Sequence, residues 1–205
     1  MESYVGGKKT FNINNQDGHP TAKKCMPLFD AITSGYIMFS PVDYYFRINE
    51  RGEQEYSYAN SVKEWIPINL HNPATIGDYP NLVSPTYRMD SPWTIKTPKG
   101  YSVMVINPLH RENSVFRIFE GIVDTDNHPS PLNFPFTLLE PNFEGLIPAG
   151  TPFAQIIPFK RDSWKMKIEE LGSPLQKHFV KENYKLQSSF WNFYKNKIWA
   201  RKSFE

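Results

Sequence analysis

Short apolar runs separated by proline- and glycine-containing turns occupy most of the chain, and this pattern predicts β-strands. The runs are rich in aromatic and β-branched residues, which fit a pleated, half-buried surface. With 18 prolines in the chain and few helical runs, strands this short and closely spaced predict an all-β sandwich or barrel. Strands are expected at 35–39, 42–49, 93–97, 101–107, 115–118, 120–124, 146–147 and 153–159.

Two turns in this pattern predict β-hairpins. Pro148-Ala149-Gly150 precedes the run 153–159, and Pro98-Lys99-Gly100 precedes the run 101–107. Proline presets φ for a turn, and glycine adopts positive φ without steric cost. Each turn is therefore expected to join its two flanking strands into one hairpin.

The two ends of the chain depart from the β pattern. Residues 1–24 are polar and predict an N-terminal arm or a weak strand. The segment 162–171 predicts one or two helical turns, with Asp162 or Ser163 as N-cap. Residues 174–202 carry apolar residues among lysines and arginines and predict one long amphipathic helical segment.

These elements predict one domain with appendages, which suits a chain of 205 residues. The parts expected are an N-terminal arm at 1–24, a β domain at 25–164 and a basic, aromatic C-terminal helical arm at 165–205. The β domain is expected to begin with a packed element at 25–32 that continues into the strand at 35–39.

Composition narrows the class of protein only slightly. The chain is 40% hydrophobic and 15% aromatic, which is typical of a globular protein whose apolar mass is carried by rings. A formal net charge of +2 excludes a polyanion binder by overall charge, although the C-terminal segment is basic. A single cysteine, Cys25, excludes an intrachain disulfide and a cysteine-based zinc cluster. We expect Cys25 to be a small buried hydrophobe.

The chain shows no targeting or membrane signal. No basic and apolar regions of a signal peptide follow Met1-Glu2-Ser3-Tyr4. No run approaches the roughly 18 apolar residues of a membrane helix. We therefore expect a soluble, cytoplasmic protein without a membrane partner.

Asp124, Asp126 and His128 form the main candidate catalytic cluster. At positions i, i+2 and i+4 of a strand they would share one face and bind a divalent metal. The alternative, which we prefer, is that Asp124 accepts backbone N–H bonds at a strand end and that His128 lies on the surface. No metal site is therefore assigned.

Other polar residues are further candidates. His110 and Arg111 can hold an anion, although a solvated loop is the preferred interpretation. Gln155 is expected to satisfy backbone groups beside a pocket. No Gly-x-Ser-x-Gly elbow supports a hydrolase triad.

Cations and aromatic rings interleave in the C-terminal segment. Rings that stack on bases, among cations that meet phosphates, would suit nucleic acid. The same composition suits an amphipathic helix docked on a protein partner or a neighbouring subunit. We prefer docking because the density of rings exceeds what a solvated helix tolerates. The residues are Lys177, Phe179, Lys181, Tyr184, Lys185, Phe190, Trp191, Phe193, Tyr194, Lys195, Lys197, Trp199, Arg201 and Lys202.

Four motifs in sequence order give 31–160 a resemblance to the dUTPase / dCTP-deaminase superfamily. The resemblance implies a dUTPase-like β-clip fold and a trimer whose C-terminal arms reach across to neighbouring subunits. It places the water-activating carboxylate on Asp124 and makes Tyr36, Arg111 and Gln155 candidate ligand-binding residues. The motifs are Thr33-Ser34-Gly35-Tyr36-Ile37-Met38, Pro98-Lys99-Gly100-Tyr101, Gly121-Ile122-Val123-Asp124 and Gly150-Thr151-Pro152-Phe153-Ala154-Gln155-Ile156.

More closely, 25–164 resembles an uncharacterised family of unknown function found in bacteria and marine phages. That family shares the Gly-[IV]-Val-Asp-Thr-Asp and Ile-Pro-Ala-Gly-Thr-Pro words. This second resemblance supports the fold and implies no activity. A phage setting would make the protein a virion or host-interaction component, located in the host cytoplasm or the virion.

Several positions depart from the enzyme pattern. Ile37 stands where the enzymes have an acidic residue near the metal. The stretch 107–113 replaces their phosphate-binding Arg-Ser-Gly word, so the backbone nest is missing. Asn127-His128-Pro129 replaces the tyrosine that stacks under the sugar, and the basic tail replaces the glycine-rich lid. Triphosphate hydrolysis would therefore lack charge neutralisation of the phosphate oxygens.

Two functional hypotheses follow. The preferred one is a non-catalytic dUTPase-like module for binding or assembly, homotrimeric through its C-terminal arm and without a cofactor. The alternative is a nucleotide or small-molecule hydrolase in which Asp124 activates water, with Asp126 or His128 as helper. A role for Mg²⁺ is considered only under that alternative.

Overall fold

The computed structural model describes residues 10–13, 16–20, 25–59, 65–72, 85–111, 113–168, 172, 174–188 and 193–204. The chain divides into two compact units. The body is Gly35–Arg161, and the second unit combines both chain ends, Met1–Ser34 and Asp162–Glu205. These boundaries differ from the sequence expectation, because residues 25–34 group with the C-terminal segment rather than with the β domain.

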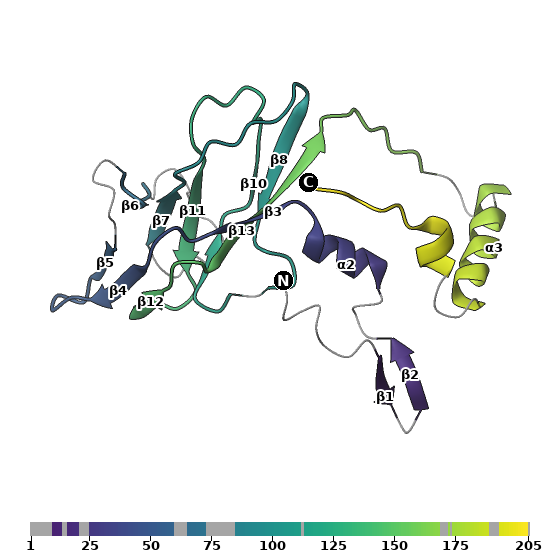
Figure 1. The fold of residues 1–205 in the computed structure, drawn as a ribbon, viewed down its shortest axis with the longest axis horizontal. Coiled ribbons are helices and arrows are strands. Elements are labelled where there is room, and N and C mark those ends of the chain that lie inside the picture. The colour runs from purple at the N-terminus through teal and green to yellow at the C-terminus, as the bar shows by residue number, and fades with distance from the viewer. Residues whose placement is uncertain are drawn as a thin grey trace. The chain divides into compact units, whose positions relative to one another are not determined.

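The described part of the body forms three antiparallel sheets, which confirms the all-β prediction (Figure 1). The first sheet has the order β10 (Gly121–Val123), β8 (Tyr101–Ile106), β13 (Pro152–Lys160), β3 (Tyr36–Phe39). The second has the order β6 (Ile68–Leu70), β7 (Thr86–Asp90), β11 (Asn133–Leu138), β9 (Phe116–Ile118). The third has the order β12 (Gly145–Ile147), β4 (Tyr44–Ile48), β5 (Gln54–Tyr58).

The predicted turn at Pro148-Ala149-Gly150 is correct, but the hairpin around it is wrong. Gly150 has φ +82°, yet β12 pairs with β4 whereas β13 pairs with β8 and β3. The turn carries the chain from one sheet to another because it is bonded to the segment before β4. The Ala149 N–H donates to Asp43 Oδ1 at 2.7 Å, and the Gly150 N–H donates to the Ser40 carbonyl at 2.8 Å.

The second predicted hairpin, around Pro98-Lys99-Gly100, also does not form. Residues 94–98 have no regular secondary structure, and β8 pairs with β10 and β13 instead. Turn chemistry fixes the local bend but not which strands meet. The longer of the two ladders of β8 is the one with β13.

Aromatic rings hold the first and second sheets together. Phe153 of β13 stacks on Phe116 of β9 with ring centroids 4.6 Å apart, and it meets Phe136 of β11 edge-on at 5.2 Å. All three rings are buried. Buried aromatic pairs contribute about 0.5–1.5 kcal/mol each beyond their buried area. Part of the high aromatic content of the sequence therefore serves the core, in which Tyr44, Phe46, Tyr87 and Phe134 are also buried.

The second unit holds the helices and a small hairpin. Its elements are β1 (Thr10–Ile13), β2 (Gln16–Pro20), α2 (Met26–Thr33), α3 (Pro174–Ser188) and the π-helix η3 (Tyr194–Ile198). The packed element expected at 25–32 is thus helix α2, and Cys25 before it is exposed rather than buried. None of the helices in the described part of the chain is long and apolar enough to cross a membrane.

The helical turns expected between Asp162 and Leu171 are wrong over the described residues 162–168, which lack regular secondary structure. Apolar and basic residues alternate there with a period of two, which suits an extended chain rather than a helix. The long segment expected at 174–202 forms α3 and then η3, and the stretch 189–192 lies outside the described residues.

One carboxylate joins the two ends of the chain within the second unit. Asp30 of α2 accepts a hydrogen bond from Trp199 Nε1 at 2.9 Å and one from Lys202 Nζ at 2.6 Å. The Asp30 side chain is 15% exposed and that of Lys202 is 47% exposed, so the carboxylate is sheltered from solvent but the lysine is not. We call this contact the Asp30 clasp.

Candidate functional site

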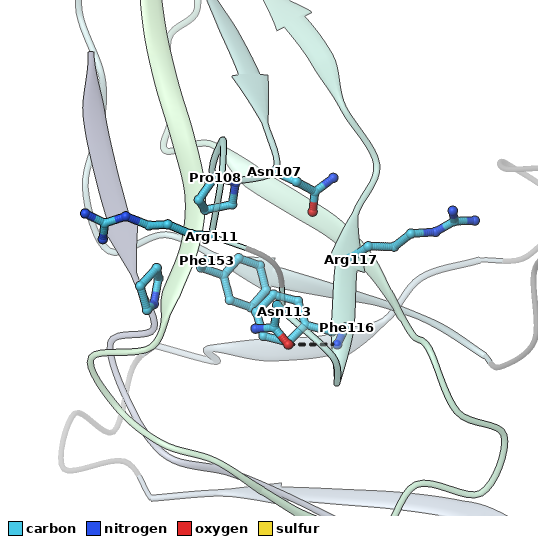
Figure 2. A pocket seen from close by; sticks show the side chains of 8 residues that line it. Asn107, Pro108, Arg111, Asn113, Phe116, Arg117 and Phe153 are labelled. Carbon is cyan, nitrogen blue, oxygen red and sulfur yellow. Dashed lines mark hydrogen bonds between the residues drawn. The ribbon is translucent and has the colours of Figure 1, made fainter. Parts of the chain in front are cut away.

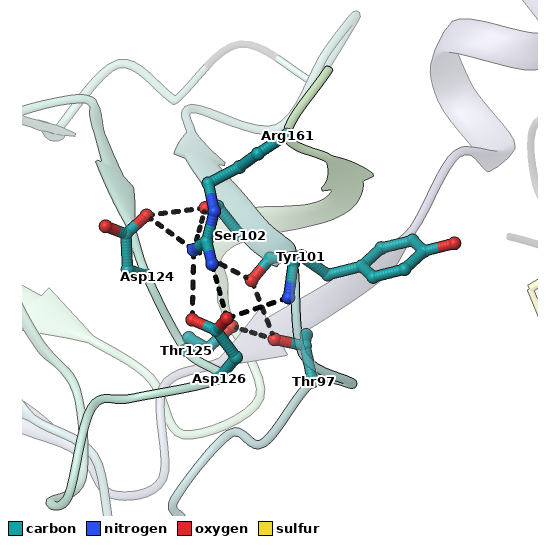
Figure 3. Close-up of polar contacts among 8 residues, drawn as sticks. Thr97, Tyr101, Ser102, Asp124, Thr125, Asp126 and Arg161 are labelled. Atoms are coloured by element: carbon teal, nitrogen blue, oxygen red, sulfur yellow. Dashed lines mark hydrogen bonds and ion pairs between the residues drawn. The ribbon is translucent and has the colours of Figure 1, made fainter.

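Three neighbouring strands of the first sheet bring the candidate residue Asp124 close to two residues that the sequence motifs do not single out. Asp124 directly follows β10, Ser102 lies on β8 and Arg161 directly follows β13. The register aligns Val123 with Val103, which places Ser102 beside Asp124. Figure 3 shows the Arg161 guanidinium between the carboxylates of Asp124 and Asp126.

Arg161 contacts the side chains of Ser102, Asp124 and Asp126, which together with it form the cluster. Its Nη1 donates to Asp126 Oδ1 at 2.9 Å and to Ser102 Oγ at 3.0 Å, and it lies 3.0 Å from Asp124 Oδ1. Its Nη2 pairs with Asp126 Oδ2, which makes the contact with Asp126 bidentate. Bidentate arginine–carboxylate pairs are among the stronger and more directional ion pairs in proteins.

Asp126 is a structural carboxylate. Its side chain is only 3% exposed, and Oδ2 also accepts the Gly100 N–H at 2.9 Å. Hydrogen bonding to Arg161, followed by the bond from Gly100, lowers the pKa of Asp126 to about 2. The backbone bond that the sequence led us to expect at Asp124 is therefore made by Asp126. It ties the 125–127 turn to the Pro98-Lys99-Gly100 turn.

Asp124 is the accessible member of the cluster, with 64% of its side chain exposed. Its Oδ1 accepts the Ser102 hydroxyl at 2.6 Å. This bond, together with those from Arg161, lowers the pKa of the Asp124 carboxyl. A carboxylate with a lowered pKa is a weaker general base, because proton acceptance becomes less favourable.

His128 does not join the carboxylates. The less favoured alternative, in which Asp124, Asp126 and His128 share one strand face, is wrong, because β10 ends at Val123 and 125–127 form a turn. His128 Nδ1 lies 2.8 Å from the Ser130 carbonyl oxygen, which can only accept, so Nδ1 carries the proton. Among the residues that the structure describes, no three His, Cys, Asp or Glu side chains are grouped to hold a metal ion.

Gln155 satisfies a backbone group, as expected, although it lines none of the cavities described below. It is 1% exposed, and its Oε1 accepts the Leu109 N–H at 2.9 Å. This bond anchors the loop between β8 and β9, which contains His110 and Arg111. His110 has φ +56°, a conformation that histidine tolerates better than most residues.

Arg111 lines a cavity of about 280 Å³ over the stacked rings of Phe116 and Phe153. A second cavity of about 310 Å³ shares Arg111 with the first. Figure 2 shows Arg111 and Arg117 extending to opposite sides of the rings. The two guanidinium groups therefore do not converge on one anion, as a phosphate clamp would require.

Two asparagines in the first cavity cap the free edge of β9. Asn107 accepts the Ile118 N–H at 3.0 Å and donates to its carbonyl at 3.2 Å. Asn113 accepts the N–H groups of Val115 and Phe116 at 2.8 and 3.2 Å. Their side-chain amides take the place of a neighbouring strand, so this edge is satisfied within the body.

The candidate residues do not form one site. Tyr36 lies on β3, at the opposite end of the first sheet from Asp124, and Gln155 is committed to the loop before β9. Sequence analysis missed Ser102 and Arg161 as partners of the aspartates. One feature of the sequence could have indicated such a partner. Asp124 and Asp126 are only two positions apart, and two neighbouring carboxylates that are sheltered from solvent need a cation beside them.

Comparison with known proteins adds no relative from which a role can be transferred: no protein-family model, curated protein or solved structure matches the chain.

Proposed function

We propose that the protein is a non-catalytic binding or assembly module with a dUTPase-like β-clip body, and that it forms a homotrimer through its C-terminal arm. The four motifs between Thr33 and Ile156 support the fold proposal, together with the three antiparallel sheets of the body. The C-terminal part of the second unit, Asp162–Glu205, contains the arm expected at 165–205, and we call this whole part the arm from here on.

The observation that carries the proposal is the pairing of Arg161 with both Asp124 and Asp126. A water-activating or metal-binding carboxylate needs free oxygens directed into a site. Both oxygens of Asp126 and one oxygen of Asp124 are bound by Arg161, Ser102 or Gly100. The cluster therefore connects the ends of β8, β10 and β13, and we assign it a structural rather than a catalytic role.

The composition and exposure of the arm support association. The arm has nine Lys and Arg against five Asp and Glu, whereas Gly35–Arg161 has ten against 13. It also exposes large apolar side chains, including Trp164 at 90%, Tyr184 at 73% and Phe179 at 59%. Apolar groups this exposed mark interaction surfaces. Arm and body have opposite charge, which favours contact between copies of the chain over binding of nucleic acid.

Size-exclusion chromatography with light scattering on the full chain tests the assembly proposal. A trimer has three times the chain mass of 23.9 kDa, and it is expected to dissociate in high salt if arm–body charge attraction contributes. A mass of one chain at every concentration tested would overturn the proposal.

A hydrolase that uses Asp124 is the second candidate. The observation in its favour is that Asp124 is 64% exposed and that its contacts with Ser102 and Arg161 are both made through Oδ1. Thermal shift against a panel of nucleotides, with and without Mg²⁺, tests it, because a ligand of the native state raises the melting temperature. Absence of any shift counts against the hydrolase. Hydrolysis that Asp124→Asn abolishes while the fold is kept would overturn the non-catalytic proposal.

A further inference from the structure

The two cavities beside the loop between β8 and β9 share three lining residues, which are Arg111, Asn113 and Pro152. Their volumes are about 280 and 310 Å³. Cavities of this size lie at the lower end of the range in which proteins bind small molecules. The chemistry of the lining residues therefore indicates which kind of small molecule fits.

Arg111 supplies a cation to both cavities. Its guanidinium makes no hydrogen bond or ion pair with any residue that the structure describes, and the residue is partly buried. A guanidinium has five N–H donors in a planar fork and no acceptor. A fork that is partly withdrawn from water and lacks a counter-charge can bind an anion.

The backbone that carries Arg111 is held in place. The Arg111 N–H donates to the carbonyl of the buried Pro108 at 3.1 Å, which closes a turn. Within that turn the Leu109 N–H donates to Gln155 Oε1 at 2.9 Å. The base of the arginine side chain is thus positioned before a ligand arrives, which lowers the entropy lost on binding.

Asn113 supplies a second donor. Its Oδ1 is occupied by the N–H groups of Val115 and Phe116, which fixes the orientation of the amide. Figure 2 shows the nitrogen on the side of the amide away from the bond to Phe116. None of the described residues accepts a hydrogen bond from this Nδ2. The amide therefore presents N–H groups beside the shared arginine.

The remaining walls select a singly charged anion with an apolar body. No Asp or Glu is among the described residues that line either cavity, and Pro108, Pro152 and Phe153 give the first one apolar walls. Arg117 extends to the other side of the rings from Arg111 (Figure 2), so one guanidinium faces each anion. A phosphate group carries almost two negative charges, whereas a carboxylate carries one and matches the arginine fork bidentately.

We propose that these cavities bind a carboxylic acid with an apolar body. Arg111 and the Nδ2 of Asn113 hold the carboxylate, and Pro108 and Pro152 contact the apolar part. The inference goes beyond the proposed assembly role, because it assigns a ligand to the body and holds for a monomer and for a trimer alike. A free small acid and the C-terminus of a peptide that ends in an apolar residue share this chemistry.

Ligand-observed NMR titration of the full chain with hydrocinnamate tests the site. Hydrocinnamide is the matched control, because it has the same apolar body and shape without the charge. The acid is expected to bind at least tenfold more tightly than the amide, since hydrogen bonds to a charged group are the stronger ones. Equal binding of the two, or no binding of the acid, would overturn the proposal. So would inorganic phosphate that displaces hydrocinnamate at equal concentration.

Variants assign the binding to these residues. Arg111→Gln is expected to weaken binding of hydrocinnamate at least tenfold, whereas Arg51→Gln, at an exposed position in the turn between β4 and β5, leaves it unchanged. Asn113→Asp keeps an acceptor for the N–H groups of Val115 and Phe116 but replaces the donor with a charged oxygen. It is expected to weaken binding at least tenfold as well. An unchanged affinity in Arg111→Gln that folds as the wild type does overturns the proposal.

A peptide separates the two sources of the carboxylate. Acetyl-Gly-Gly-Phe with a free C-terminus and the same peptide with a C-terminal amide are added as competitors of hydrocinnamate. Displacement by the free acid alone supports the proposal with a peptide C-terminus as the ligand. Displacement by neither supports it with a small acid, because the cavity is then closed to a chain. Displacement by both peptides equally shows that the carboxylate is not recognised and overturns the proposal.

Discussion

Gly35→Ala tests how closely the start of β3 approaches β13. Gly35 has φ +66°, and a Cβ added there would lie 2.0 Å from the carbonyl oxygen of Ile156 and 3.0 Å from Cα of Ile157. Only a residue without a side chain fits this position. The alanine variant therefore introduces two costs, one from the backbone conformation and one from the overlap with β13.

The two costs can be separated with Gly52→Ala. Gly52 has φ +76°, and a Cβ added there would meet no atom within 4 Å, so alanine carries only the conformational cost of roughly 1–2 kcal/mol. At Gly35 the backbone of β13 must also move by about 1 Å to restore a normal contact. Overpacking of this kind adds about 1–3 kcal/mol, and each ladder bond lost adds about 1 kcal/mol. Gly35→Ala is expected to exceed Gly52→Ala by at least about 2 kcal/mol.

Urea unfolding followed by circular dichroism measures both variants. A lower midpoint at an unchanged slope indicates lost stability rather than an altered unfolded state. Equal destabilisation by Gly35→Ala and Gly52→Ala, within about 0.5 kcal/mol, would refute the close approach of β3 and β13. Failure of the Gly35 variant alone to fold agrees with it.

Two further predictions concern the polar anchors of the body. The folded-state pKa of Asp126 is about 2, below its ordinary value of 3.8, so its pairing stabilises the fold above about pH 4 and loses that contribution as the pH falls toward 2. The stability difference between wild type and Arg161→Met is therefore expected to be largest at neutral pH and to shrink in acid, as urea midpoints across this range would show; a difference that grows in acid contradicts the ion pair. Gln155→Leu leaves the Leu109 N–H without its acceptor and is expected to cost about 1–3 kcal/mol, measured by urea unfolding; an unchanged midpoint would mean that the loop finds another partner.

The sequence predicts the local pieces of the body well. Aromatic and β-branched runs mark most strands, and Gly150 marks a true turn with positive φ. It does not predict which strands meet, because partner choice depends on distant contacts such as the one from Ala149 to Asp43. The same residues that predict a hairpin therefore connect two different sheets.

At the candidate site, too, the sequence predicts the individual residues but not their contacts with distant residues. Asp124 and Asp126 stand out in the sequence, but whether a carboxylate is reactive depends on its neighbours in space. Arg161 lies 35 residues from Asp126 and belongs to no motif, so its pairing becomes visible only when β13 lies beside β8. Gln155 was predictable because a polar residue inside an apolar strand needs a buried partner.

The Asp30 clasp joins two segments that are far apart in the sequence. Trp199 and Asp30 are 169 positions apart, and the whole of Gly35–Arg161 lies between them as an insertion in a discontinuous unit. The entropy of closing a loop grows only with the logarithm of its length, by about 0.6 kcal/mol per doubling. An insertion this large therefore costs little more to close than one half its size. We therefore expect insertions in the loops of the body to leave the contacts of Asp30 with Trp199 and Lys202 in place.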